Sequence, residues 1–200
     1  MDSVVETDRL RLRPWVPGDL AQLCRIFAEP EVWRFPFGRG FDDQETAAFL
    51  CRQLDQQEEG RPTVWAAELR QEHRLIGYAG LSVPEFLPEI LPAVEVGWRL
   101  HPDCWGRGLA TEAGGASLEH GFATFGLEEI VSIYQPDNAA SGRVMEKLGM
   151  HFERATVHPR SGLALSVYRI TRRQWGRRTD GRRAGPRHYG DEPCGPSSNA

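Results

Sequence analysis

Residues 93–113 read AVEVGWRLHPDCWGRGLATEA. The first part alternates apolar and polar residues, which predicts a β-strand over residues 93–100. Residues 111–125 place Leu118, Phe122 and Phe125 at helical intervals. A turn that contains Gly106 and Gly108 joins the two segments. The stretch therefore predicts a strand, a glycine turn and a helix.

The glycine turn is suited to hold an anion. The first N–H groups of a helix have no intrahelical partner, and the aligned peptide dipoles place partial positive charge there. Gly106 and Gly108 permit positive φ and a close approach of the backbone to a ligand, and Arg107 adds a cation. A Gly-x-Gly sequence is also common in plain turns. A phosphate site and a plain turn are therefore both open at this point.

The rest of the chain alternates predicted strands and helices, which indicates an α/β (α+β) fold. Residues 84–92 contain three prolines and are predicted to form a loop. Period-two alternation and helical spacing predict further strands over residues 9–13, 63–69, 75–81, 130–134, 150–157 and 164–170, and further helices over residues 20–28, 42–54 and 138–148.

Composition limits the class of protein. Two hundred residues with 40% hydrophobic content fit one domain, which we place at residues 1–175. No apolar run approaches the roughly 20 residues that cross a bilayer, and the first residues resemble no signal peptide, so we expect a cytoplasmic protein without a membrane partner. The four cysteines are widely spaced, which favours neither disulfides nor a metal site. The net charge of −4 disfavours specific nucleic-acid binding.

The last segment differs from the rest in composition. Residues 176–200 are rich in Arg, Gly and Pro and poor in apolar residues, which predicts a disordered tail. The arginines leave open an alternative in which the tail contacts RNA or the ribosome.

A second motif makes the glycine turn more specific. Residues 135–150 read QPDNAASGRVMEKLGM and follow the turn by about 30 residues. With WGRGLATEA at 105–113 and NAASGRVMEKLG at 138–149, the chain resembles the GNAT superfamily of N-acetyltransferases, in particular its ribosomal-protein N-terminal (alanine/serine) acetyltransferase branch. The similarity extends more loosely from Thr7 to Ile170. It implies a mixed, mostly antiparallel central sheet of six to seven strands flanked by about four helices.

The resemblance also implies the function. Members of the superfamily transfer acetyl from acetyl-CoA to amines. Their glycine turn receives the pyrophosphate of coenzyme A, and the pantetheine arm pairs with the strand before the turn, like an added strand. No metal is implied. The implied cofactor-binding residues are Trp98, Arg99, Leu100, Trp105, Gly106, Arg107, Gly108, Leu109, Ala110, Thr111, Asn138 and Ser141.

The chemistry needs a base for the amine and a donor for the departing thiolate. Glu95 is the candidate base, acting through a water, and the alternative is that it is simply a surface carboxylate or a paired one. Ser141 is the candidate donor to the sulfur, and Asn138 either holds the pantetheine amide or caps a helix. Met145 stands where many members carry a tyrosine acid. This departure keeps a non-catalytic, acyl-CoA-binding regulatory module as the alternative function.

The amine acceptor is expected to contact segments outside these motifs. Residues 33–38 are aromatic, and the loop at 84–92 is apolar, so the loop either covers the site or forms a homodimer contact. Glu85, Glu89 and Glu95 attract a cationic amine. This charge fits a peptide N-terminus, a polyamine and an aminoglycoside alike.

Overall fold

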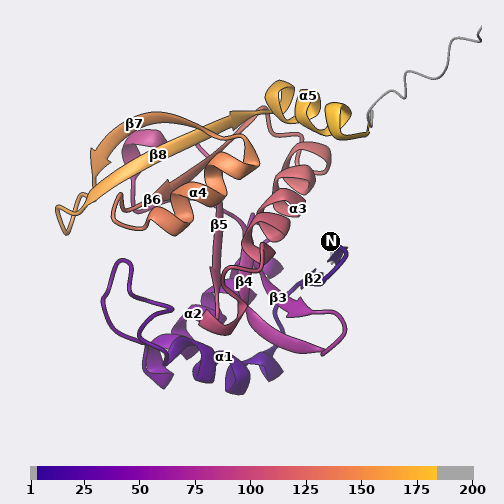
Figure 1. Cartoon of the computed structure of the whole chain (residues 1–200). Helices are drawn as coiled ribbons and strands as arrows, with labels where there is room; N and C mark the ends of the chain where they lie inside the picture. The colour runs from indigo at the N-terminus through magenta and orange to yellow at the C-terminus, as the bar shows by residue number, and fades with distance from the viewer. Residues whose placement is uncertain (1–3, 184–200) are drawn as a thin grey trace, which may run out of the picture.

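The computed structural model describes residues 4–183, which form one eight-stranded sheet in the order β1-β2-β3-β4-β5-β6-β8-β7 (Figure 1). Every neighbouring pair is antiparallel except β5 and β6, which are parallel. The fold prediction is confirmed, but the expected number of strands is one too low. The strands are β1 (Val5–Glu6), β2 (Leu10–Arg13), β3 (Val64–Leu69), β4 (Arg74–Ser82), β5 (Glu95–Leu100), β6 (Glu129–Tyr134), β7 (His151–Val157) and β8 (Ala164–Thr171).

The described residues form five α-helices, and the last of them changes the interpretation of the tail. Trp175 Nε1 donates to Glu119 Oε2 over 2.7 Å, and Arg172 Nε donates to the Leu127 carbonyl over 2.9 Å. These contacts dock a helix that includes residues 176–183, for which the composition predicts disorder. Residues 184–200 lie outside the described residues. The helices are α1 (Leu20–Phe27), α2 (Asp43–Glu58), α3 (Leu109–Ala123), α4 (Ala139–Leu148) and α5 (Arg172–Arg183).

The helices cover both faces of the sheet, and strand β3 shows why. Successive side chains of a strand point to opposite faces. Val64 and Ala66 pack into a core cluster with residues of α1 and α2, whereas Trp65 and Ala67 pack into a cluster with residues of α3. The sheet therefore lies between α1 and α2 on one face and α3 on the other (Figure 1).

The sheet opens between β5 and β6. The two strands pair only at Glu95 and Val131, where the Val131 N–H donates to the Val94 carbonyl over 3.0 Å. The Ser132 hydroxyl donates to the Val96 carbonyl over 2.8 Å. Because successive peptides of a strand point to alternate sides, the main chain of Trp98 faces the same side as Val94 and Val96. At Trp98, however, β6 has diverged, so this peptide faces a gap.

Candidate active site

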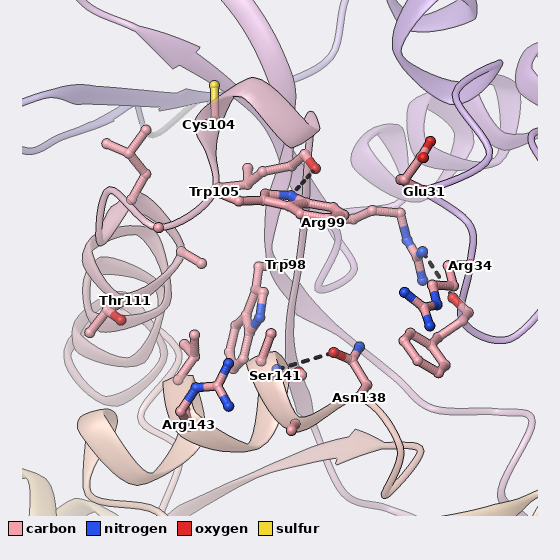
Figure 2. A pocket seen from close by; sticks show the side chains of 18 of the residues that line it. Glu31, Arg34, Trp98, Arg99, Cys104, Trp105, Thr111, Asn138, Ser141 and Arg143 are labelled. Atoms are coloured by element: carbon pink, nitrogen blue, oxygen red, sulfur yellow. Dashed lines mark hydrogen bonds between the residues drawn. The ribbon is translucent and has the colours of Figure 1, made fainter.

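A cleft of about 460 Å³ lies between β5, the start of α3 and the start of α4, and we call it the first cleft (Figure 2). It brings the two sequence motifs together. Arg107 alone among the predicted cofactor-binding residues lies outside its lining, and its carbonyl accepts from Arg9 Nη1 over 2.8 Å. The predicted residues that line the first cleft are Trp98, Arg99, Leu100, Trp105, Gly106, Gly108, Leu109, Ala110, Thr111, Asn138 and Ser141.

The backbone of the glycine turn is rich in free donors. The N–H groups of residues 106–111 donate no hydrogen bond to any residue that the structure describes. Gly106 has φ +70° and Gly108, the N-cap of α3, has φ +77°, conformations that favour glycine. Free amides at the N-terminus of a 15-residue helix form an anion site. The turn therefore has the donor set that a pyrophosphate needs.

Two cations on α4 line the same cleft. Arg143 and Lys147 lie four residues apart and so share one face of the helix (Figure 2 labels Arg143). Sequence reasoning missed both residues. Their spacing within the second motif is the signal that would have found them.

Asn138 and Ser141 cap helix α4 and also leave polar groups free for a ligand. Asn138 is the N-cap of α4, and its Oδ1 accepts from the Ser141 N–H over 3.2 Å (Figure 2). The capping interpretation is confirmed. The Asn138 amide nitrogen and the Ser141 hydroxyl make no hydrogen bond within the described part of the chain, so both remain available to a ligand.

Arg99 is engaged by the protein itself. Its Nη1 donates to the Phe35 carbonyl over 3.0 Å and to the Val32 carbonyl, and its guanidinium lies 3.9 Å from the centre of the Trp33 ring. Its Nε donates to the Tyr78 hydroxyl over 3.2 Å. The guanidinium therefore fixes the aromatic segment against β5.

A second cleft of about 410 Å³ adjoins the first at the gap in the sheet. Phe35, Trp98, Arg99, Asn138 and Ser141 line both clefts. Residues of the two segments expected to contact the acceptor also line the second cleft, namely Phe35, Pro36, Phe37 and Phe86. The first cleft therefore holds the glycine turn, and the second holds the aromatic segments.

Glu95 lies half-buried in the second cleft. Desolvation raises its pKa to about 7, although a hydrogen bond from the Ile133 backbone and the charge of Arg99 oppose the rise. A carboxyl group with this pKa is suited to accept a proton near neutral pH. Of the other two acidic candidates, Glu85 pairs with Arg61 over 2.6 Å and Glu89 accepts from Thr156 over 2.6 Å. Neither of these two lines the second cleft.

Three other side chains bear on the chemistry. Met145 is a residue of α4 that packs into the core, and its thioether has no proton to donate, so it supplies no acid. Tyr134 lines the second cleft, and desolvation and the neighbouring Tyr168 raise its pKa. Cys104 lines the first cleft, but burial raises the pKa of its thiol and keeps it protonated.

The described residues contain no group of three His, Cys, Asp or Glu side chains placed to hold a metal ion. None of the helices in residues 4–183 is long and apolar enough to span a bilayer.

Comparisons with known proteins agree with this geometry. A family model described as an acetyltransferase (GNAT) domain matches residues 9–151. The uncharacterized N-acetyltransferase YoaA of Bacillus subtilis is 29% identical over 154 residues, which cover 76% of this chain and 85% of YoaA. A crystal structure of an acetyltransferase from Agrobacterium tumefaciens aligns with a TM-score of 0.71 at 27% identity and covers 85% of this chain and 95% of that one.

A structure of RimL, a ribosomal alpha-N-protein acetyltransferase in complex with coenzyme A, aligns with a TM-score of 0.70. It is 16% identical to this chain, and the alignment covers 84% of this chain and 98% of RimL, so it shows the fold alone. The family model spans more than half of the sequence and includes the glycine turn and the asparagine motif. The chain therefore belongs to the GNAT acetyltransferase family.

Proposed function

We propose that the protein transfers acetyl from acetyl-CoA to a primary amine by direct attack in a ternary complex. The observation that carries the proposal is the meeting of two clefts at the gap between β5 and β6. One holds the free amides of residues 106–111, and the other holds a carboxyl group whose pKa is about 7. The first suits the coenzyme, and the second suits a base that acts on the amine.

The first cleft fits coenzyme A in the chemistry of its donors. The free N–H groups of the glycine turn bind the pyrophosphate, and Arg143 and Lys147 supply positive charge for its phosphates. The exposed peptide of Trp98 pairs with the amide of the pantetheine arm, as an added strand does. The free amide nitrogen of Asn138 donates to the same arm.

The coenzyme supplies an activated acetyl thioester. The residues at the gap move the protons and stabilise the negative charge that develops during the transfer. Glu95 takes the proton of the amine, through a water. The Trp98 N–H stabilises the negative charge that develops on the carbonyl oxygen, and one such donor typically contributes about 2.7 to 4 kcal/mol to lowering the barrier. The Ser141 hydroxyl donates to the departing sulfur, and Tyr134 is the alternative donor.

The family membership favours an enzyme over the non-catalytic alternative, which rested on Met145. Ser141 and Tyr134 both line the second cleft, so the loss of the tyrosine at position 145 leaves other donors at the gap. The acceptor is a protein N-terminus or a small-molecule amine. The structural likeness to RimL, a ribosomal alpha-N-protein acetyltransferase, supports the N-terminus, and the second cleft accommodates either class of amine.

The test is a thiol-release assay with acetyl-CoA against peptides of varied N-termini, polyamines and aminoglycosides. We expect release above the hydrolytic background for at least one class, with mass spectrometry showing an acetylated amine. Isothermal titration with coenzyme A serves as the parallel measurement. Binding without acetylation of any amine would favour the regulatory module.

A further inference from the structure

Three exposed apolar side chains gather around the second cleft. Phe37 is 55% exposed, Phe86 is 43% exposed and Leu163 is 39% exposed, and all three line this cleft. They come from separate segments, namely the aromatic stretch at 33–38, the loop at 84–92 and the hairpin between β7 and β8. Apolar side chains that converge on a concave site mark a surface that a ligand covers.

The walls of this cleft are held together by contacts between those segments. The Phe86 ring stacks on the His158 ring with centroids 5.6 Å apart and an interplanar angle of 9°. Thr156 Oγ1 donates to Glu89 Oε1 over 2.6 Å and joins the same loop to β7. The apolar wall is therefore built into the fold rather than left on a free loop.

Few charged side chains line the second cleft. Glu95 is the sole carboxylate among the described residues that line it. Arg99 lines it as well, and its guanidinium repels a cation. Burying an ammonium group without a partner is costly. The cleft therefore matches one positive charge and offers nothing for the further charges of a polyamine or an aminoglycoside.

We propose that the acceptor is a singly charged amine that carries a large apolar or aromatic group next to the amine. Glu95 faces the amine, and Phe37, Phe86 and Leu163 cover the apolar group. This inference rests on the proposed function, because it assigns the substrate class of the same site. The acidic residues of the sequence fit a peptide N-terminus, a polyamine and an aminoglycoside equally well. This inference favours the first class over the other two.

The experiment compares kcat/KM for phenylalaninamide, glycinamide and spermidine in the acetylation assay. Phenylalaninamide and glycinamide have the same amine and amide and differ only in the side chain. Since burial of an aromatic side chain contributes a tenfold or larger preference, we expect phenylalaninamide to exceed glycinamide by about tenfold or more. We expect it to exceed spermidine as well.

The variant Phe86→Ser tests whether the wall causes this preference. We expect it to lower the phenylalaninamide to glycinamide ratio of kcat/KM by about tenfold, as does Phe37→Ser. The matched control is Phe152→Ser, because Phe152 is 58% exposed on β7 and lines neither cleft. It leaves the ratio unchanged.

Two kinds of failure are distinguishable. Equal kcat/KM for the two amides, a preference for spermidine, or an unchanged ratio in Phe86→Ser would overturn this inference while acetyl transfer stands. Coenzyme binding with no acetylated product from any amine would overturn the proposed function and this inference with it.

Discussion

Arg9 Nε donates to Glu112 Oε2 over 2.6 Å, and the Arg9 backbone N–H donates to Glu112 Oε1 over 2.9 Å. The two residues are 103 positions apart, so this pairing joins the residue just before β2 to the first turn of α3. Burial alone would raise the pKa of Glu112, but the hydrogen bonds from Thr7 and Arg9 outweigh it and lower the pKa. With the bond from Arg9 to the Arg107 carbonyl, the pair holds the glycine turn in place.

The first prediction concerns this support. Arg9→Met removes the side-chain bonds to Glu112 and to the turn, so we expect acetyl-CoA affinity to fall about fivefold and stability by about 1 kcal/mol. Titration calorimetry and urea unfolding measure the two effects. Arg11→Met is the control on the strand that follows, β2, since Arg11 lies 4.0 Å from its partner Glu6. Wild-type affinity in Arg9→Met would show that the turn needs no support.

The second prediction concerns the anion site itself. Gly108→Asp places a carboxylate at the amides of the α3 N-terminus, so we expect acetyl-CoA to bind at least tenfold more weakly. The substitution also strains a residue at φ +77°. Gly60→Asp is the matched control, because Gly60 has φ +68°, has open space around it and lies outside both clefts. Equal loss of affinity in the two variants would refute the phosphate assignment.

The sequence predicted those features of the fold and the site that depend on residues close together in the chain. The glycine turn, the asparagine cap and seven of the strands follow from patterns within about 20 residues. The two-residue strand β1 is too short for any periodicity, and α5 depends on docking through Arg172 and Trp175. The contact of Arg9 with the turn and the stacking of Phe86 on His158 join distant segments. No single-sequence pattern encodes such pairs.

The third prediction concerns the base. The raised pKa of Glu95, about 7, means that the carboxyl group is protonated at pH 6 and ionised at pH 8. Only the ionised form accepts a proton, so kcat/KM should rise with pH through about 7 and level off above it. Glu95→Gln has no titrating carboxyl group, so we expect kcat/KM no longer to rise with pH in this range. We also expect activity to fall by about 100-fold.

The control for this profile is Glu85→Gln, because Glu85 pairs with Arg61 outside both clefts. This variant should keep the rise of kcat/KM with pH. Stopped-flow thiol detection across pH 5.5 to 9 gives both profiles. A rise that persists in Glu95→Gln would belong to the amine or to another group.

The fourth prediction concerns thiolate release. Ser141→Ala removes the free hydroxyl but keeps the backbone N–H that bonds to Asn138. We therefore expect kcat to fall about tenfold, whereas the Kd for acetyl-CoA changes little. Ser161→Ala, in the exposed turn between β7 and β8, is the control. Wild-type kcat in Ser141→Ala would leave Tyr134 as the donor.

The last prediction concerns two adjacent glycines in α3, Gly114 and Gly115, which differ in how closely their neighbours pack. A Cβ on Gly114 would lie 2.9 Å from Leu148 Cδ1 and 3.3 Å from the Trp98 ring, whereas a Cβ on Gly115 would meet only side chains at 3.7 Å. Alanine is favoured over glycine in a helix by about 1 kcal/mol. Gly115→Ala should therefore stabilise the protein by up to about 1 kcal/mol.

Gly114→Ala gains the same propensity but must displace Leu148 and the Trp98 ring, and overpacking typically costs about 1–3 kcal/mol. We expect it to lower the free energy of unfolding. Because Trp98 lines both clefts, we also expect it to weaken acetyl-CoA binding, whereas Gly115→Ala leaves binding unchanged. Thermal unfolding with and without acetyl-CoA measures both effects. Equal stabilisation by the two substitutions would mean that α3 moves away from β5 without cost, and that Gly114 is not needed for close packing.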